Sequence, residues 1–141
     1  MRTEIRIRNC REDDLADLIR IWRQVDLTLG ISDTIPELKR MLALNPDTCL
    51  VLEHNGRVVA GVMGGFDGRR GLVHHLSVAP EFQRCGYGRA LMEELETRFR
   101  GMYVVKYSLW IEPRNQSVID FYNHIGYELR DLITFSKTLR Q

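Results

Sequence analysis

Residues 77–89 read SVAPEFQRCGYGR and join a predicted strand to a predicted helix. The first amides of a helix have no partner within it, and together with the helix dipole they attract phosphate groups. Gly86 and Gly88 lack a Cβ, so a phosphate can approach their backbone closely, and Arg84 and Arg89 would add positive charge. The stretch therefore favours a phosphate-binding turn, although two glycines alone also fit an ordinary strand-to-helix turn.

Two familiar nucleotide-binding loops do not fit these residues. A P-loop requires Gly-Lys-Ser/Thr, whereas Gly88 is followed by Arg89 and Ala90. A dinucleotide-binding fingerprint requires a third glycine, and Leu91 occupies that position. Both nucleotide interpretations are therefore disfavoured.

The chain on either side of this turn alternates strand and helix signals. Asn55-Gly56 and Asp67-Gly68 are typical hairpin turns, so three antiparallel strands should precede the phosphate-binding turn. The expected strands span residues 4–8, 48–53, 57–66, 71–78 and 103–111, with one or two more in 127–139, and the expected helices start near residues 13, 35, 88 and 115. This order, β-α-α-β-β-β-α-β-α-β-β, predicts an α/β fold with a mixed, mostly antiparallel sheet flanked by helices on both faces, in one domain of residues 1–141.

Composition and charge argue against several classes of protein. A chain of 141 residues suits one domain, and a net charge of +1 gives no reason to expect nucleic-acid or membrane partners. The longest apolar run, residues 58–66, is far shorter than the roughly 20 residues that span a bilayer. Cys10, Cys49 and Cys85 lie far apart without metal-ligand spacing, and nothing marks the chain for export. We therefore expect reduced thiols, no metal and a cytoplasmic protein.

Two motifs in register resemble those of the GCN5-related N-acetyltransferase (GNAT) superfamily. Residues 83–88, QRCGYG, fit its Gln/Arg-x-x-Gly-x-Gly/Ala signature, and residues 76–80, LSVAP, look like its fourth strand. Residues 115–127, NQSVIDFYNHIGY, are similar to its Asn-x-x-Ala-x-x-x-Tyr-x-x-x-Gly-Phe motif, with Val118 in place of Ala and Tyr127 in place of Phe. The resemblance covers essentially the whole chain and points to a small stand-alone bacterial member.

The resemblance implies a GNAT-type fold and an acetyl-CoA-dependent N-acetyltransferase. Such an enzyme transfers acetyl directly from its co-substrate acetyl-CoA to an amine of a small molecule, peptide or protein. The residues that the resemblance assigns to acetyl-CoA binding are Leu76, Val78, Gln83, Arg84, Cys85, Gly86, Tyr87, Gly88, Arg89 and Asn115. A non-catalytic acyl-CoA-binding module is the alternative. Members of the superfamily often dimerise, so a homodimer is a possible assembly.

Tyr122 is the predicted proton donor to the leaving thiolate, whose pKa as a free thiol is near 8.5. This role rests on the resemblance, because from its position alone Tyr122 also fits the apolar face of a helix. Asn115 fits a helix N-cap and, by the resemblance, also contacts CoA. The resemblance places the donor for the reaction's oxyanion on a backbone N–H around Val78.

The attacking amine must first lose a proton, because a lysine-like amine has a pKa near 10.4. His74 is the candidate base, since similar aralkylamine-type members carry a histidine there; a half-buried structural histidine is the alternative. Successive side chains of a strand face opposite sides, so we expect His75 to lie away from the site. Glu112, Glu81 and Asp67 are further candidates that also fit solvated or turn positions.

Overall fold

The computed structural model describes residues 2–140, which divide along the chain into two compact units, one ending at Leu109 and the other beginning at Trp110. The first unit holds a five-stranded sheet and three helices, and the second holds one helix. The elements are β1 (Ile5–Asn9), η1 (Glu12–Asp14), α1 (Leu15–Gln24), α2 (Ile35–Leu44), β2 (Cys49–His54), β3 (Arg57–Phe66), β4 (Gly71–Val78), η2 (Pro80–Phe82), α3 (Tyr87–Gly101), β5 (Tyr107–Leu109) and α4 (Gln116–His124). Residues 1–141 as a single domain stay a prediction.

The sheet has the strand order β1-β2-β3-β4-β5. Its first four strands pair antiparallel, and β5 pairs parallel to β4, with Gly71 opposite Tyr107. The hairpin signals in the sequence therefore located three strands correctly, and α3 makes the crossover between the two parallel strands. The predicted fold class, a mixed and mostly antiparallel α/β sheet, is confirmed.

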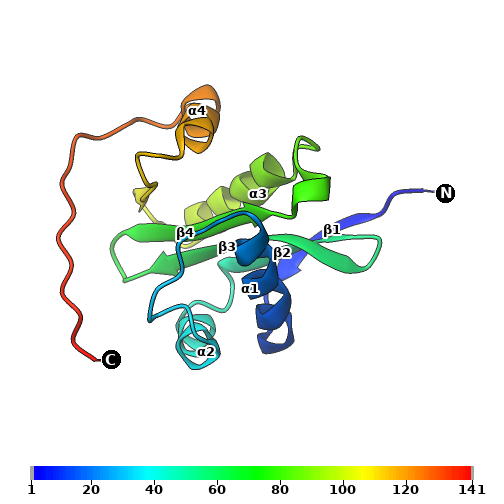
Figure 1. Cartoon of the computed structure of the whole chain (residues 1–141), viewed down its shortest axis with the longest axis horizontal. Helices are drawn as coiled ribbons and strands as arrows, with labels where there is room; N and C mark the ends of the chain where they lie inside the picture. The colour runs from blue at the N-terminus through cyan, green and yellow to red at the C-terminus, as the bar shows by residue number, and fades with distance from the viewer. Residues whose placement is uncertain (1, 141) are drawn as a thin grey trace. The chain divides into compact units, whose positions relative to one another are not determined.

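Helices cover both faces of this sheet, as the sequence predicted: α1 and α2 lie on one face and α3 lies on the other (Figure 1). Two glycines of β3 show how closely the helices pack. A Cβ added to Gly61 would lie 2.5 Å from the Leu18 side chain of α1, and one added to Gly64 would lie 2.7 Å from the Leu95 side chain of α3. Small residues on β3 thus let a helix approach the sheet on each side.

An ion-pair cluster fixes the start of α1 against the sheet. The Arg8 guanidinium on β1 donates two hydrogen bonds to the Asp14 carboxylate, at 2.7 and 2.9 Å, and a third to Glu53 on β2 at 2.8 Å. The Asp14 carboxylate also accepts from the Arg11 backbone amide at 2.8 Å. Burial opposes ionisation of Asp14, but the bonds from Arg8 and Arg11 outweigh it, so its pKa is lowered.

A bulge interrupts β4 in the middle of the strand. Ser77 pairs with Gly61, and His74 pairs with Met63. Two residues of β4, His75 and Leu76, therefore lie opposite one residue of β3, Val62. His75 has a φ of +52°, a left-handed conformation that is uncommon for a residue with a side chain. We expected His75 to face away from His74 because successive side chains of a strand alternate. The bulge breaks that alternation at His75.

The end of the chain differs from the prediction. The strand expected at 103–111 is reduced to β5, because Tyr103 has a φ of +61° and continues the turn that ends α3. No strand forms in residues 127–140, so the one or two last strands were wrong. Several large apolar residues of this segment are exposed, Phe135 by 93% and Leu139 by 91%.

Candidate functional site

The turn between β4 and α3 has the geometry that a phosphate-binding site needs. Gly86 is the N-cap residue of α3 with a φ of +84°, and Arg84, two residues earlier, is also left-handed with a φ of +63°. No side chain of the described residues caps the helix, so its first amides are left for a ligand. A Cβ added at Gly86 would meet nothing within 4 Å, so the space beside this backbone is open. Alternating left-handed residues of this kind form concavities that bind anions.

Two side-chain hydrogen bonds hold this turn in place. The Gln83 side-chain amide donates to the Val78 carbonyl at the end of β4, at 3.1 Å. The Tyr87 hydroxyl lies 2.7 Å from His54 Nδ1 on β2, and the Tyr87 ring stacks on Phe82. These contacts tie both ends of the turn to the sheet, so its backbone is preorganised before any ligand arrives.

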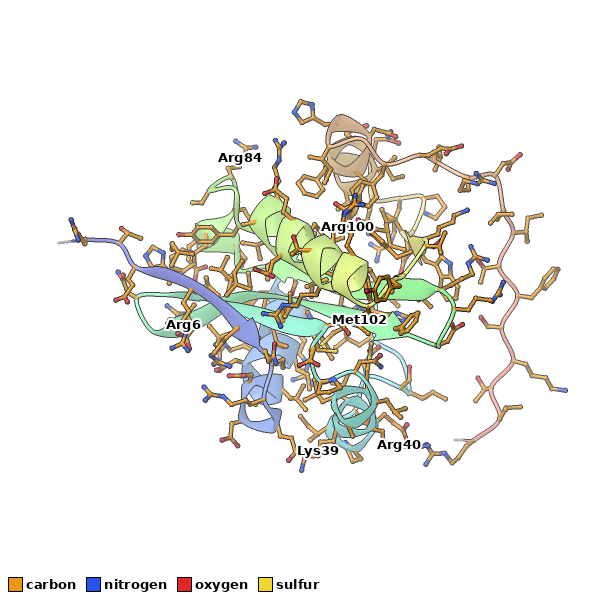
Figure 2. All side chains as sticks on the ribbon, turned by 180° about the vertical axis from the view of Figure 1, so that it is seen from behind. Arg6, Lys39, Arg40, Arg84, Arg100 and Met102 are labelled. Carbon is orange, nitrogen blue, oxygen red and sulfur yellow. The ribbon has the colours of Figure 1, made fainter. Side chains whose placement is uncertain are left out.

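The predicted positive charges lie at the same turn. Arg84 is exposed, and Figure 2 shows its side chain at the tip of the turn, directed away from the sheet. Arg89 pairs with Glu93 one helical turn along α3, at 3.1 Å, which offsets part of its charge. Cys85 is exposed, and its Sγ lies 3.7 Å from the Gln83 carbonyl oxygen. Arg84 is thus the cation of this turn best placed to meet a phosphate.

The two histidines of β4 lie together, with ring centroids 6.2 Å apart in an edge-on arrangement. The expectation that strand alternation would separate them was wrong, because the bulge at His75 changes the direction of its side chain. His75 Nε2 lies 2.8 Å from Asp33 Oδ1, in the connection between α1 and α2. Burial lowers the pKa of His74, and the neighbouring His75 lowers it further, while Asp33 acts against both. His74 is therefore neutral at pH 7.

The other carboxylates considered as bases have ordinary structural partners. Asp67 is exposed and accepts the amides of Arg69 and Arg70 within its hairpin; these bonds lower its pKa, which weakens it as a base. Glu81 is exposed and pairs with Arg57 at 3.7 Å. Glu112 is only partly buried and pairs with Arg114, two residues along the chain, at 2.6 Å. None of the three is buried in a way that would make its carboxylate a stronger base.

Tyr122 lies on α4, in the second unit, and is 7% exposed. Its ring contacts the rings of Phe121 and Tyr127, both with centroids 5.1 Å away. Burial raises the pKa of Tyr122, and Tyr127 raises it further, so the hydroxyl keeps its proton throughout the neutral range. This is the protonation state that a proton donor requires.

Asn115 holds the N-cap position of α4, as predicted, but not through its side chain. Its backbone carbonyl accepts the amides of Val118 and Ile119, both at 3.1 Å, whereas its side chain makes no capping bond. The predicted N-cap position is therefore confirmed, and the side-chain amide is left for another contact. Gly126 follows the last turn of α4 with a φ of +95°, as a helix-ending glycine does.

Asp33 and Trp22 are candidate site residues that sequence analysis missed. Asp33 lies in a connection without regular structure, so no periodic pattern draws attention to it. Trp22 is fully buried on α1 and fits the helix's apolar face, yet its ring lies 4.6 Å from the His75 ring, and its Nε1 has no hydrogen-bond partner among residues 2–140. Only the folded chain shows that these residues share one environment.

Within residues 2–140, no group of three or more histidine, cysteine, aspartate or glutamate side chains is placed to hold a metal ion. No helix in that range has the length and apolar character to cross a membrane.

The fold and the turn together define a class: an α/β protein whose central helix begins at a turn of the kind that binds phosphate. The chain belongs to the acetyltransferase (GNAT) family, whose sequence model matches residues 13–127. It is an acetyl-CoA-dependent N-acetyltransferase, which confirms the resemblance found in its two motifs.

Similar proteins agree with this assignment. An acetyltransferase of Pectobacterium atrosepticum is 38% identical over 133 residues, which cover 94% of each chain. Among solved structures, Ard1 from Thermoplasma volcanium matches with a TM-score of 0.82 and 21% identity, covering 90% of this chain and 84% of that one. PaiA N-acetyltransferase from Thermoplasma acidophilum, solved in complex with coenzyme A, matches with a TM-score of 0.81 and 16% identity, covering 92% and 93%. At these identities the two structures support the fold.

Proposed function

We propose that the protein transfers the acetyl group of acetyl-CoA directly to an amine of a small molecule, peptide or protein. The observation that carries this proposal is the uncapped start of α3 behind the left-handed Gly86. In this proposal the CoA pyrophosphate binds the amides of residues 86–89, with Arg84 as a neighbouring cation. The PaiA N-acetyltransferase that shares this fold was solved with coenzyme A, which supports the choice of ligand.

The acetyl group lies along the end of β4 in this proposal. The amine nitrogen attacks the thioester carbonyl carbon, a C–N bond forms, and negative charge builds up on the carbonyl oxygen. A backbone N–H around Val78 stabilises that oxygen. The C–S bond then breaks, and its electron pair leaves on sulfur. Leu76 and Val78 flank the acetyl group, because they occupy the last residues of the strand before the turn.

Tyr122 supplies the proton that the departing thiolate takes. The raised pKa of Tyr122 keeps its hydroxyl protonated through the neutral range, so it has a proton to give, although the same burial makes it a weaker acid. Asn115 lies on the same helix and contacts CoA through its uncommitted side-chain amide. Both roles are carried over from the motif in residues 115–127.

The adjacent histidines of β4 are the two candidate bases in this proposal, and His74 is the one carried over from the sequence. Its lowered pKa keeps the imidazole neutral at pH 7, so it can accept a proton, although the same desolvation makes it a weaker base. It could act on the amine directly or through a water molecule.

The experiment that tests the proposed function is an acceptor screen. The purified protein is mixed with acetyl-CoA and a panel of polyamines, amino sugars, amino acids and peptides, and release of the CoA thiol is measured with a thiol reagent. Thiol release that depends on an acceptor, with acetylated amine found by mass spectrometry, supports the proposal. Acetyl-CoA binding without acceptor-dependent release across the panel would instead indicate the non-catalytic acyl-CoA-binding module.

A further inference from the structure

The bulge in β4 creates a second group able to take a proton. At His75 the chain adopts a left-handed φ of +52°, and the side chain meets Asp33 at 2.8 Å from Nε2. Bulges often redirect a side chain beside an active site, and backbone strain of this kind persists only where the surrounding structure holds it. The residue next to the candidate base is thus held in an uncommon conformation against a carboxylate.

Asp33 is itself held in place. Its second oxygen, Oδ2, accepts the Gly30 amide at 2.8 Å, and its own amide donates to the Gly30 carbonyl at 3.1 Å. The side chains of Asp33 and His75 are only 13% and 20% exposed. Two bonds within a tight turn therefore hold the carboxylate in the orientation that meets His75.

This arrangement decides which nitrogen of His75 carries the proton. An ionised carboxylate only accepts hydrogen bonds, so His75 Nε2 must donate to Asp33 and carry the hydrogen in the neutral ring. The lone pair is then on Nδ1, which is the atom left to accept a proton. A carboxylate that binds one nitrogen in this way both fixes the tautomer and stabilises the imidazolium that forms.

The surroundings of His75 contain an unpaired polar group. The Trp22 ring lies 4.6 Å from the His75 ring, and its buried N–H has no acceptor among residues 2–140. A buried N–H without a partner is rare and calls for a water or a ligand nearby. The titratable groups that the structure places against His75 are Asp33 and His74, one from the α1–α2 connection and one from β4 itself.

We propose that His75, oriented by Asp33, is the base that removes the proton from the acceptor amine, and that Asp33 is a positioning residue. This inference rests on the proposed acetyl transfer. The amine N–H proton passes to His75 Nδ1 as the C–N bond forms, and the C–S bond breaks with its electrons on sulfur. The imidazolium then gives its proton to solvent. The acceptor amine consequently lies on the α1–α2 side of the sheet, beside the bulge.

The test compares the same substitution at three histidines. In His75→Gln, the side-chain amide can still donate to Asp33 but cannot take up a proton. We expect kcat/KM for the amine to fall about 100-fold or more at pH 7, with unchanged affinity for acetyl-CoA. The acid limb of the pH–rate profile, which requires a neutral imidazole, should disappear. His74→Gln should retain that limb, and His124→Gln, at an exposed position on α4, should match the wild type.

Asp33→Asn separates positioning from a purely structural role. It keeps an atom able to bond His75 Nε2 but removes the negative charge that favours the imidazolium. The kcat for amine acetylation should therefore fall while the affinity for acetyl-CoA stays unchanged. A wild-type profile in His75→Gln, or loss of the limb in His74→Gln alone, would overturn the proposal.

A second readout does not depend on finding the acceptor. Nitrogen-15 NMR of the imidazole side chains should show His75 as the Nε2–H tautomer at neutral pH, and Asp33→Ala should abolish that preference. A mixed tautomer in the wild type would contradict the inference even if the enzyme is active. If instead the tautomer is as expected but no amine is acetylated, the proposed function fails rather than the His75–Asp33 arrangement.

Discussion

Replacing Gly86 by alanine should weaken acetyl-CoA binding with little loss of fold. The added Cβ meets no protein atom within 4 Å, so the folded protein bears only the cost of a left-handed alanine, about 1–2 kcal/mol. A phosphate seated on the amides of α3 would meet that Cβ. Losing one charge-assisted hydrogen bond costs about 1.5–3 kcal/mol, so we expect the dissociation constant to rise about 10- to 150-fold.

Isothermal titration calorimetry with acetyl-CoA measures this change, and a thermal melt of each variant checks the fold. The matched control is Gly68→Ala, in the hairpin that precedes β4. Gly68 has a φ of +101° and also has nothing within 4 Å of an added Cβ, so the alanine there is strained without facing the turn. If Gly86→Ala is folded and binds acetyl-CoA as the wild type does, the phosphate does not lie on these amides.

Two further predictions concern catalysis and stability. Tyr122→Phe should lower kcat by about 100- to 10,000-fold while leaving acetyl-CoA affinity unchanged, because only the hydroxyl is lost; an unchanged kcat with chemistry rate-limiting would make Tyr122 a core residue. Asp14→Asn should cost about 1.5–3 kcal/mol of unfolding free energy at pH 7, because it removes one of the two carboxylates that bind the half-buried Arg8 and leaves only Glu53. The lowered pKa of Asp14 means that its contribution is complete above the unfolded carboxyl's pKa and is lost as pH falls through the folded value. Urea unfolding of wild type and variant should therefore converge at low pH, and a gap that stays constant down to pH 2 would contradict this account.

Local signals were sufficient for most of the fold. Asn-Gly and Asp-Gly turns fix hairpins within a few residues, so β2, β3 and β4 were placed with their ends correct to within a residue or so. The glycine turn and the helix after it also follow from nearby residues, since Gly86 is needed where φ is positive. The family assignment rested on the same local motifs.

The errors arose where distant parts of the chain decide the outcome. Alternation placed His74 and His75 on opposite sides, but a bulge depends on how β4 pairs with β3, which one strand's sequence does not reveal. The apolar residues of 127–139 suggested strands, yet strand formation requires a partner edge. Asp33 gave no signal because its role depends on the folded position of the α1–α2 connection.

The bulge also explains how one short segment can carry both the proposed base and the proposed phosphate site. In a regular strand, His74 and His75 would face opposite layers, and only one could reach the α1–α2 side. The extra residue in β4 turns His75 toward Trp22 and Asp33 while the end of the strand still leads into the turn before α3. The proposed base and the proposed phosphate site are therefore carried by one short, continuous segment, residues 75–89. A variant that removes the bulge from β4 should impair proton removal by His75 more than it impairs CoA binding. The turn that would bind CoA is held by separate contacts, from Gln83 to Val78 and from Tyr87 to His54.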